Sequence, residues 1–125
     1  MYFVFGSNES GIHGSGAARS AYKNYDAVLG KGFGPTRYTF AIPTKDWKIQ
    51  TLPLETVKVY VDAFIRFARH ERNYSFMVTR IGCGLAGFKD EEIAPLFKDA
   101  PSNCQFDLAW KPCLGESVNY WGTYE

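Results

Sequence analysis

The sequence predicts an α/β fold, in which helices cover a mainly parallel or mixed sheet. Short β-prone runs alternate along the chain with segments of helical periodicity. A helix predicted over residues 54–70 stands between two such runs and is long enough to connect a parallel pair of strands. Two glycine-rich loops each follow a predicted strand and precede a predicted helix start. These observations predict a sheet with a ligand site built by the two loops.

The composition limits the class of protein. At 125 residues the chain is most simply one domain, and its 46% hydrophobic and 22% charged residues are typical of a globular protein. The formal net charge of +1 gives no general basic field for nucleic acid. Aromatic residues reach 17%, which suits either a rigid core or flat walls for a base, and a core is the favoured interpretation.

The N-terminus and the cysteines bear on location. Residues 1–6 have no basic n-region and reach glycine too early for a signal peptide, and no apolar run approaches membrane-spanning length. Cys83, Cys104 and Cys113 lack the spacing of a zinc site or redox pair, so we expect no metal ion, no cofactor and a reducing cytoplasm. Cys83 is expected to be a small apolar filler, and a catalytic thiol is the alternative.

The first glycine loop, residues 6–16, connects a predicted strand at 2–5 to a predicted helix at 17–25. Its small residues near the helix start would let that helix lie against a ligand. These residues are Gly14, Ser15, Gly16, Ala17 and Ala18. One such loop alone is more typical of a tight turn, but two in one short chain favour a phosphate or nucleotide site.

Lys45 is the candidate reactive group. Residues 38–42 predict a strand that Pro43 ends, after an irregular connection over residues 26–37. Thr44 and Lys45 then lie just past the strand's carboxyl end, the edge where open α/β sheets bind ligands. A surface lysine is usually solvated. This position instead suits an amine held near a ligand, because a lysine nucleophile needs a sheltered place to lose its proton.

Residues 54–70 predict the clearest helix, with an apolar stripe at i, i+3, i+4 and i+7 spacing. The stripe indicates packing, and we assign it no chemistry. Its members are Val57, Tyr60, Val61, Phe64 and Ala68, with Ile65 and Phe67 at its edges.

The second glycine loop, residues 80–88, follows a strand predicted at 75–79 and precedes an acidic first turn that begins at Asp90. Its glycines leave bare amides close to a helix N-terminus, where they carry partial positive charge and let an anion approach closely. The pattern predicts a phosphate-binding loop.

The C-terminal part predicts a short helix over residues 90–99, with its true start nearer Glu92 because Pro95 fits only in a first turn. Residues 103–110 alternate enough to form the last strand. The hydrophobic residues of segment 111–125 follow neither helical nor strand periodicity. We therefore expect a domain over residues 1–110 and an aromatic tail that packs on it or contacts another copy, with the oligomeric state open.

Two motifs resemble macrodomains that bind ADP-ribose. They are Ala-Ile-Pro-Thr-Lys-Asp-Trp at residues 41–47 and Arg-Ile-Gly-Cys-Gly-Leu at residues 80–85, separated by a helix. The resemblance is greatest to terminal ADP-ribose protein glycohydrolase and to the bacterial antitoxin macrodomain that removes ADP-ribose from thymidine in DNA. It extends to small uncharacterised phage and bacterial proteins, and covers roughly residues 1–100. It implies a three-layer sandwich with helices on both faces.

The resemblance also implies roles for residues. Lys45 would be the catalytic lysine, and the first loop would hold the distal ribose, oriented by Asn8. The second loop would wrap the diphosphate and distal ribose. The implied ligand-binding residues are Gly6, Ser7, Asn8, Gly14, Ser15, Gly16, Thr44, Ile81, Gly82, Cys83, Gly84 and Leu85.

Ala86 departs from the pattern, because the protein glycohydrolase has an acid there that resolves a lysine-linked intermediate. Asp46, Asp90 or His13 would have to replace that catalytic acid. The first hypothesis is therefore a hydrolase of an ADP-ribosyl linkage on protein or DNA. The alternative is a non-catalytic module that sequesters or senses ADP-ribose or a related NAD-derived nucleotide. A third hypothesis is a Rossmann-like scaffold whose aromatic tail binds protein.

Overall fold

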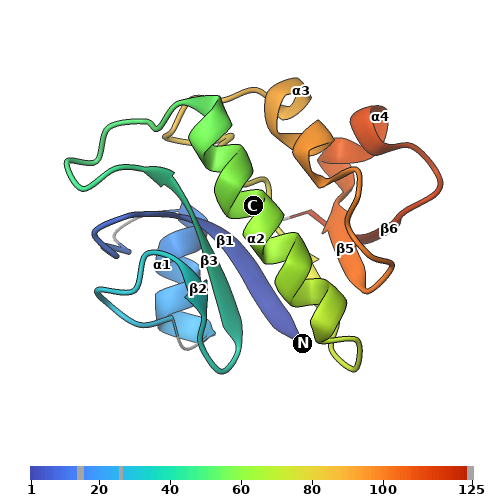
Figure 1. The fold of residues 1–125 in the computed structure, drawn as a ribbon, viewed down its shortest axis with the longest axis horizontal. Coiled ribbons are helices and arrows are strands. Elements are labelled where there is room, and N and C mark those ends of the chain that lie inside the picture. Colours follow the sequence, from blue (N-terminus) through green and yellow to red (C-terminus); the bar gives the residue numbers. More distant parts are fainter. Residues whose placement is uncertain (14–15, 26, 124–125) are drawn as a thin grey trace.

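The computed structural model describes residues 1–13, 16–25 and 27–123, and these form a six-stranded mixed sheet in the order β2-β3-β1-β4-β5-β6 (Figure 1). Neighbouring strands are parallel except for β2, which is antiparallel to β3. The strands are β1 (Tyr2–Asn8), β2 (Gly34–Pro35), β3 (Thr39–Lys45), β4 (Phe76–Val78), β5 (Cys104–Asp107) and β6 (Asn119–Gly122). The α/β class predicted from the sequence is confirmed.

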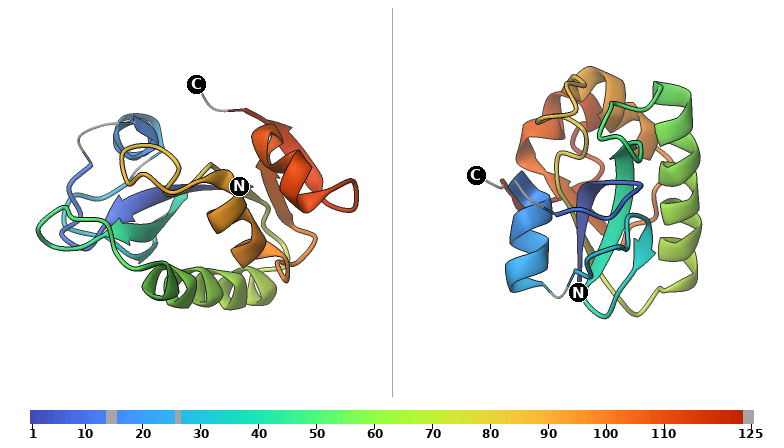
Figure 2. Two further views of the ribbon diagram at one scale, coloured as in Figure 1. Left: turned by 90° about the horizontal axis from the view of Figure 1, so that it is seen from above. Right: turned by 90° about the vertical axis from the view of Figure 1, so that its left-hand side faces the viewer.

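Helices cover both faces of the sheet, as the right-hand view of Figure 2 shows. The helices are α1 (Gly16–Asn24), α2 (Leu54–His70), α3 (Asp90–Ile93) and α4 (Lys111–Leu114), with 3₁₀ turns η1 (Ala94–Phe97) and η2 (Leu108–Trp110). Along β1, Phe3 and Phe5 pack toward α1, whereas Val4 belongs to the larger core under α2. This alternation follows from the two-residue period of a strand, and it divides the core into two layers.

The helix predicted over residues 54–70 is confirmed as α2. Its buried residues are Val57, Val61, Phe64, Ile65 and Ala68. Tyr60, predicted inside the stripe, is only partly buried, and Ile65, predicted at the edge, is buried. Among the helices of the described chain, none combines the length and apolarity needed to cross a bilayer.

Pro43 does not end its strand, contrary to the prediction. β3 continues through Pro43 to Lys45. On its outer edge, β3 pairs with β2 only at Phe40 and Ala41. A strand position without a partner on one edge tolerates a residue that lacks an N–H. The strand is thus three residues longer than predicted at this end, and Lys45 is its last residue.

The C-terminal third differs most from the prediction. The helix starts at Asp90, not near Glu92, because Glu92 Oε1 accepts from the Lys89 amide at 2.9 Å and so caps the first turn. Pro95 falls instead at the start of the following 3₁₀ turn. β5 is not the last strand, since residues 119–122 form β6 parallel to it. The segment predicted as a tail therefore adds an edge strand to the same sheet.

Candidate functional site

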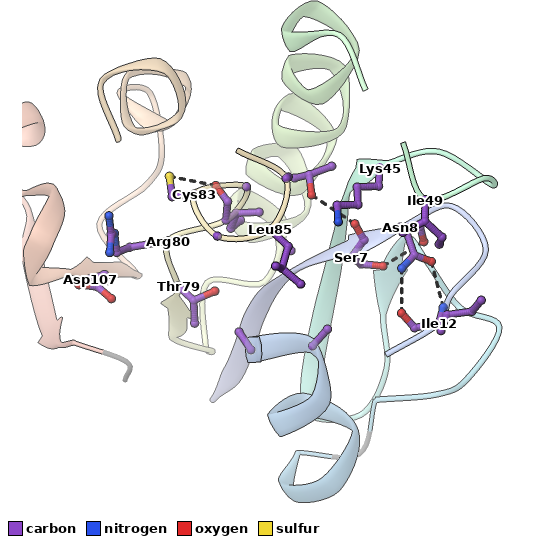
Figure 3. A pocket seen from close by; sticks show the side chains of 18 residues that line it. Ser7, Asn8, Ile12, Lys45, Ile49, Thr79, Arg80, Cys83, Leu85 and Asp107 are labelled. Carbon is purple, nitrogen blue, oxygen red and sulfur yellow. Dashed lines mark hydrogen bonds between the residues drawn. The ribbon is translucent and has the colours of Figure 1, made fainter. Parts of the chain in front are cut away.

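A cavity of about 520 Å³ opens at the carboxyl ends of the parallel strands. Both glycine loops face it (Figure 3), as the sequence led us to expect. The predicted site residues that line it are Gly6, Ser7, Asn8, Thr44, Lys45, Ile81, Gly82, Cys83, Gly84 and Leu85. Its volume falls in the range of about 300–1,000 Å³ that is typical of small-molecule sites.

Gly6 and Gly82 bring the two loops into contact. A Cβ atom at Gly6 would lie 3.1 Å from Ile81 Cγ2 and 3.3 Å from the Gly82 amide nitrogen. Gly82 has a φ of +76°, and a Cβ there would lie 3.1 Å from Phe88 Cδ2 and 3.3 Å from Thr44 Cγ2. Only glycine fits both positions without displacement, so the end of β1 packs directly against the second loop.

The second loop is shaped by hydrogen bonds within its own backbone. The Cys83 amide donates to Arg80 O, the Gly87 amide to Gly84 O and the Phe88 amide to Gly82 O, at 2.9–3.2 Å. Between residues 82 and 88, four other amides have no acceptor among the described residues: those of Gly82, Gly84, Leu85 and Ala86. Unpaired amides close together on a glycine-rich turn form a concave site for an anion.

Arg80 and Asp90 anchor the two flanks of this loop to each other. Arg80 Nε and Nη2 donate to the Asp90 carboxylate at 2.9 and 2.7 Å, and Trp110 Nε1 donates to Asp90 Oδ1 at 2.8 Å. The hydrogen bond from Arg80, with a smaller contribution from Trp110, lowers the pKa of Asp90. Asp90 lies outside the cavity lining. The structure thus places it behind the loop.

Cys83 lines the cavity as a neutral thiol. Burial, with a hydrogen bond to Asp90 as the second cause, raises the pKa of Cys83 to about 12. Its Sγ donates to Ile81 O at 3.5 Å. Because the thiolate is the nucleophilic form, the raised pKa argues against the alternative of a catalytic thiol at this position.

The first loop is held by side chains. Asn8 Oδ1 accepts from Ser10 Oγ at 2.7 Å and from the Ile12 amide at 3.0 Å, while Asn8 Nδ2 donates to Ile12 O at 2.8 Å. Ser7 Oγ donates to Gly32 O at 2.8 Å. Asn8 lines the cavity, but most of its hydrogen-bonding capacity is used to close its own loop.

His13 belongs to the first loop, but its side chain is buried away from the cavity. It is 4% exposed and packs edge-on against Phe5, and its Nε2 donates to Val28 O at 3.0 Å. It is not part of the cavity lining. Gly14 and Ser15 lie outside the described residues, and Gly16 opens α1. The next residues of the helix, Ala17 and Ala18, line the cavity.

Lys45 ends β3 opposite Asn8 of β1, and its side chain lies beside Ser7 and Asn8 in Figure 3. Its carbonyl accepts from the Glu9 amide at 2.9 Å. Within the part of the chain that the structure describes, the Lys45 ammonium has no hydrogen-bond or ion-pair partner. It is therefore available to contact a bound ligand. Asp46 is directed elsewhere, since its Oδ1 accepts from the Lys48 and Gln50 amides at 2.8 and 3.0 Å.

The predicted set of site residues leaves out several residues that line the cavity, among them Asp107, Thr79, Arg80 and Ile49. Asp107 is fully buried and accepts from the Ala109 amide at 2.9 Å. A signal was present, because Asp107 follows a strand that alternates apolar residues, and the carboxyl ends of parallel strands meet at one edge. Ile49 gave no signal, since its position depends on the turn after β3.

Comparisons with known proteins support the fold. No family model matches the sequence, and no curated protein matches it. The solved structure of Thermosipho africanus DarTG in complex with ADP-ribose superposes with a TM-score of 0.62 over 85% of this chain, at 17% identity. The present chain spans only 37% of the length of that protein. At this identity the likeness concerns the fold alone, and the α/β fold of this chain is macrodomain-like.

Proposed function

We propose that this protein binds ADP-ribose or a related NAD-derived nucleotide in the cavity. The observation that carries the proposal concerns four residues of the second loop, Gly82, Gly84, Leu85 and Ala86: their amides have no acceptor among the described residues, and all four line the same cavity as the first loop. Such amides favour a diphosphate, because they supply several donors and little steric hindrance. The ADP-ribose bound to the similarly folded DarTG supports this assignment.

The ligand would lie along the cavity with its parts assigned by the lining. The diphosphate would accept hydrogen bonds from the second loop. The terminal ribose would lie between Ser7, Asn8 and Lys45, at the end of the cavity away from Asp107 (Figure 3). Thr44 holds the two strands together at this end of the cavity, because its Oγ1 donates a hydrogen bond from β3 to Ser7 O of β1 at 3.4 Å. In this arrangement His13 and Asp90 position the two loops.

We further propose hydrolysis of an ADP-ribosyl linkage on protein or DNA as the activity, as in the branch that the motifs resemble. A neutral Lys45 amine would form a bond to the anomeric carbon while the bond from that carbon to the attached group breaks. The amine nitrogen gives up a proton as this bond forms, and the departing group takes one up. Water would then add to the anomeric carbon as its bond to Lys45 breaks, and an acid–base group has to take a proton from that water and return one to the amine. Residue 86, where the protein glycohydrolase has an acid for this purpose, is an alanine here and cannot exchange a proton.

The alternative of a binding module rests on Ala86 itself. Its carbonyl accepts from Thr51 Oγ1 at 2.8 Å, which fixes this part of the loop while offering no titratable group. Affinity without turnover would follow. Either function suits a reducing, cytoplasmic setting, since Cys83, Cys104 and Cys113 are free thiols.

Two measurements test these proposals. Calorimetry with ADP-ribose, NAD and AMP should show binding of ADP-ribose, and a lack of heat with all three would refute the nucleotide assignment.

Release of ADP-ribose from modified protein and modified DNA should be followed for the wild type, for Lys45→Ala and for the control Lys48→Ala. Release that is lost only in Lys45→Ala supports hydrolysis. Binding without release from either substrate supports the module.

A further inference from the structure

Ile49 adopts a backbone conformation that disfavours its side chain. Its φ is +63°, and among the described non-glycine residues no other has a positive φ. β-Branched side chains clash with the backbone in this left-handed region, which glycine and asparagine occupy more readily. The chain therefore places an unfavourable residue type at this point.

The turn that contains Ile49 is held by groups other than the isoleucine side chain. The Ile49 amide donates to Asp46 O at 3.1 Å, and the Asp46 amide donates to Gln50 O at 2.8 Å. The Asp46 carboxylate accepts from Lys48 and Gln50. These bonds require no particular side chain at residue 49, so the turn does not explain why isoleucine is there.

Packing within the fold does not explain it either. Ile49 is 41% exposed and belongs to neither core layer. It does line the cavity, where Figure 3 places it beside Asn8 and Lys45. Strained residues that the fold does not use are found preferentially at ligand sites. The favourable contact that offsets the strain is then expected from a bound molecule.

We propose that Ile49 covers the apolar C–H face of the terminal ribose and makes the site selective for a nucleotide that carries this sugar. The inference rests on the proposed function, because it takes the sugar to lie between Asn8 and Lys45. A branched aliphatic side chain over a sugar face removes apolar surface from water. It also shields the anomeric carbon beside the Lys45 amine from solvent. Ile49 is thus a specificity residue, and ADP, which lacks the sugar, would not contact it.

The test compares two ligands across variants whose backbone tolerates the left-handed region. Ile49→Asn and Ile49→Gly remove the apolar contact and relieve the strain. We expect each to bind ADP-ribose about 5- to 10-fold more weakly, as burial of a branched side chain implies, and ADP within about 2-fold of the wild type. The melting temperature of Ile49→Asn should equal or exceed that of the wild type. Val59→Ala, which truncates an exposed aliphatic residue of α2, is the control and should change neither affinity.

The outcomes are distinct. Unchanged ADP-ribose affinity in both variants would overturn the inference, as would an equal loss for ADP and ADP-ribose. A lower melting temperature of Ile49→Asn would also overturn it, because the isoleucine would then serve the fold. If the wild type binds neither nucleotide, the proposed function itself fails and the inference falls with it.

Discussion

The two glycine-rich loops look alike in composition but are built by different means. The first is closed mainly by a side chain: Asn8 makes three side-chain hydrogen bonds to Ser10 and Ile12, beside one backbone bond from the Gly11 amide to Asn8 O. The second is closed by its own backbone and leaves four amides unpaired among the described residues. Glycine content therefore does not reveal which loop can bind an anion. What matters is whether the backbone donors have already been used.

This difference assigns separate roles to the loops. A loop shaped by its backbone can present its remaining amides to phosphate oxygens without losing its shape. A loop shaped by a polar side chain would lose its shape if that side chain turned to the ligand. We therefore expect the second loop to supply affinity for the diphosphate and the first to shape the end of the cavity beside Lys45.

The strongest test of the second loop compares Gly82→Ala with Gly84→Ala. Alanine at residue 82 would need the left-handed region and would crowd Phe88 and Thr44, so the free energy of unfolding should fall by about 2–4 kcal/mol. Gly84 has no positive φ, and a Cβ there would have no atom within 4 Å, so its variant should fold normally. Its affinity for ADP-ribose should still fall about tenfold, because the methyl group occupies the approach to the amides. Denaturant unfolding and calorimetry measure both quantities, and normal affinity in Gly84→Ala would contradict the role of the bare amides.

Asn8→Ala tests whether side chains build the first loop. It removes three hydrogen bonds and leaves the Ile12 amide and carbonyl without partners, so it should lower the free energy of unfolding by about 1–3 kcal/mol. Asn8→Asp keeps the two accepted bonds and should be less destabilising. Denaturant unfolding of both variants measures which of them is the less stable. Equal stability of Asn8→Ala and the wild type would show that the two loops are built alike.

Asp90→Asn tests the anchor of the second loop. The pKa of Asp90 is lowered mainly by Arg80, so the folded state binds the proton more weakly than the unfolded state. The stabilisation is then present above the unfolded pKa of about 4 and is lost as the pH falls toward the lower folded value. At pH 7 the variant should lose about 1 kcal/mol, a figure that allows for the partial exposure of the pair. Urea unfolding should show this difference shrinking below pH 4, and a difference independent of pH would rule out the ion pair as its source.

Tyr60→Phe should have the smallest effect. The Tyr60 hydroxyl donates to Glu9 Oε2 at 2.7 Å and ties the first loop to α2. This bond, with burial second, raises the pKa of Tyr60 to about 12. Its contribution is present below the unfolded pKa of about 10 and is lost as the pH rises through about 12. The variant should be less stable by about 0.5–1 kcal/mol at pH 8 by thermal unfolding. An unchanged melting temperature would show that this link does not support the loop.

Much of the fold was predictable from local patterns, namely the periodicity of hydrophobic residues and the glycines and prolines that interrupt helices and strands. The spacing of Val57, Val61 and Phe64 predicted α2, and the β-prone runs before the two glycine loops predicted β1 and β4. β6 was not predictable in this way. Residues 119–122 have no clear alternation, and they become a strand only because the edge of β5 is available to pair with.

The site was predictable where it lies on strand ends, and not where it depends on loop geometry. Lys45 and the residues of the second loop follow directly from the order of strand, loop and helix. The placement of His13 and Asp90 depends on side-chain partners, Val28 and Arg80, that are distant in sequence. The role of Ile49 depends on a single backbone angle, which the residue type argues against.

The contact at Gly6 has a consequence for how the protein responds to a ligand. Because the end of β1 touches Ile81 and the Gly82 amide, neither loop can shift far without displacing the other. Ordering of one by a bound phosphate would reduce the conformational entropy that the other still has to lose. Amide exchange should therefore slow in both segments together when ligand is added, so that two pieces of chain distant in sequence behave as one cooperative unit.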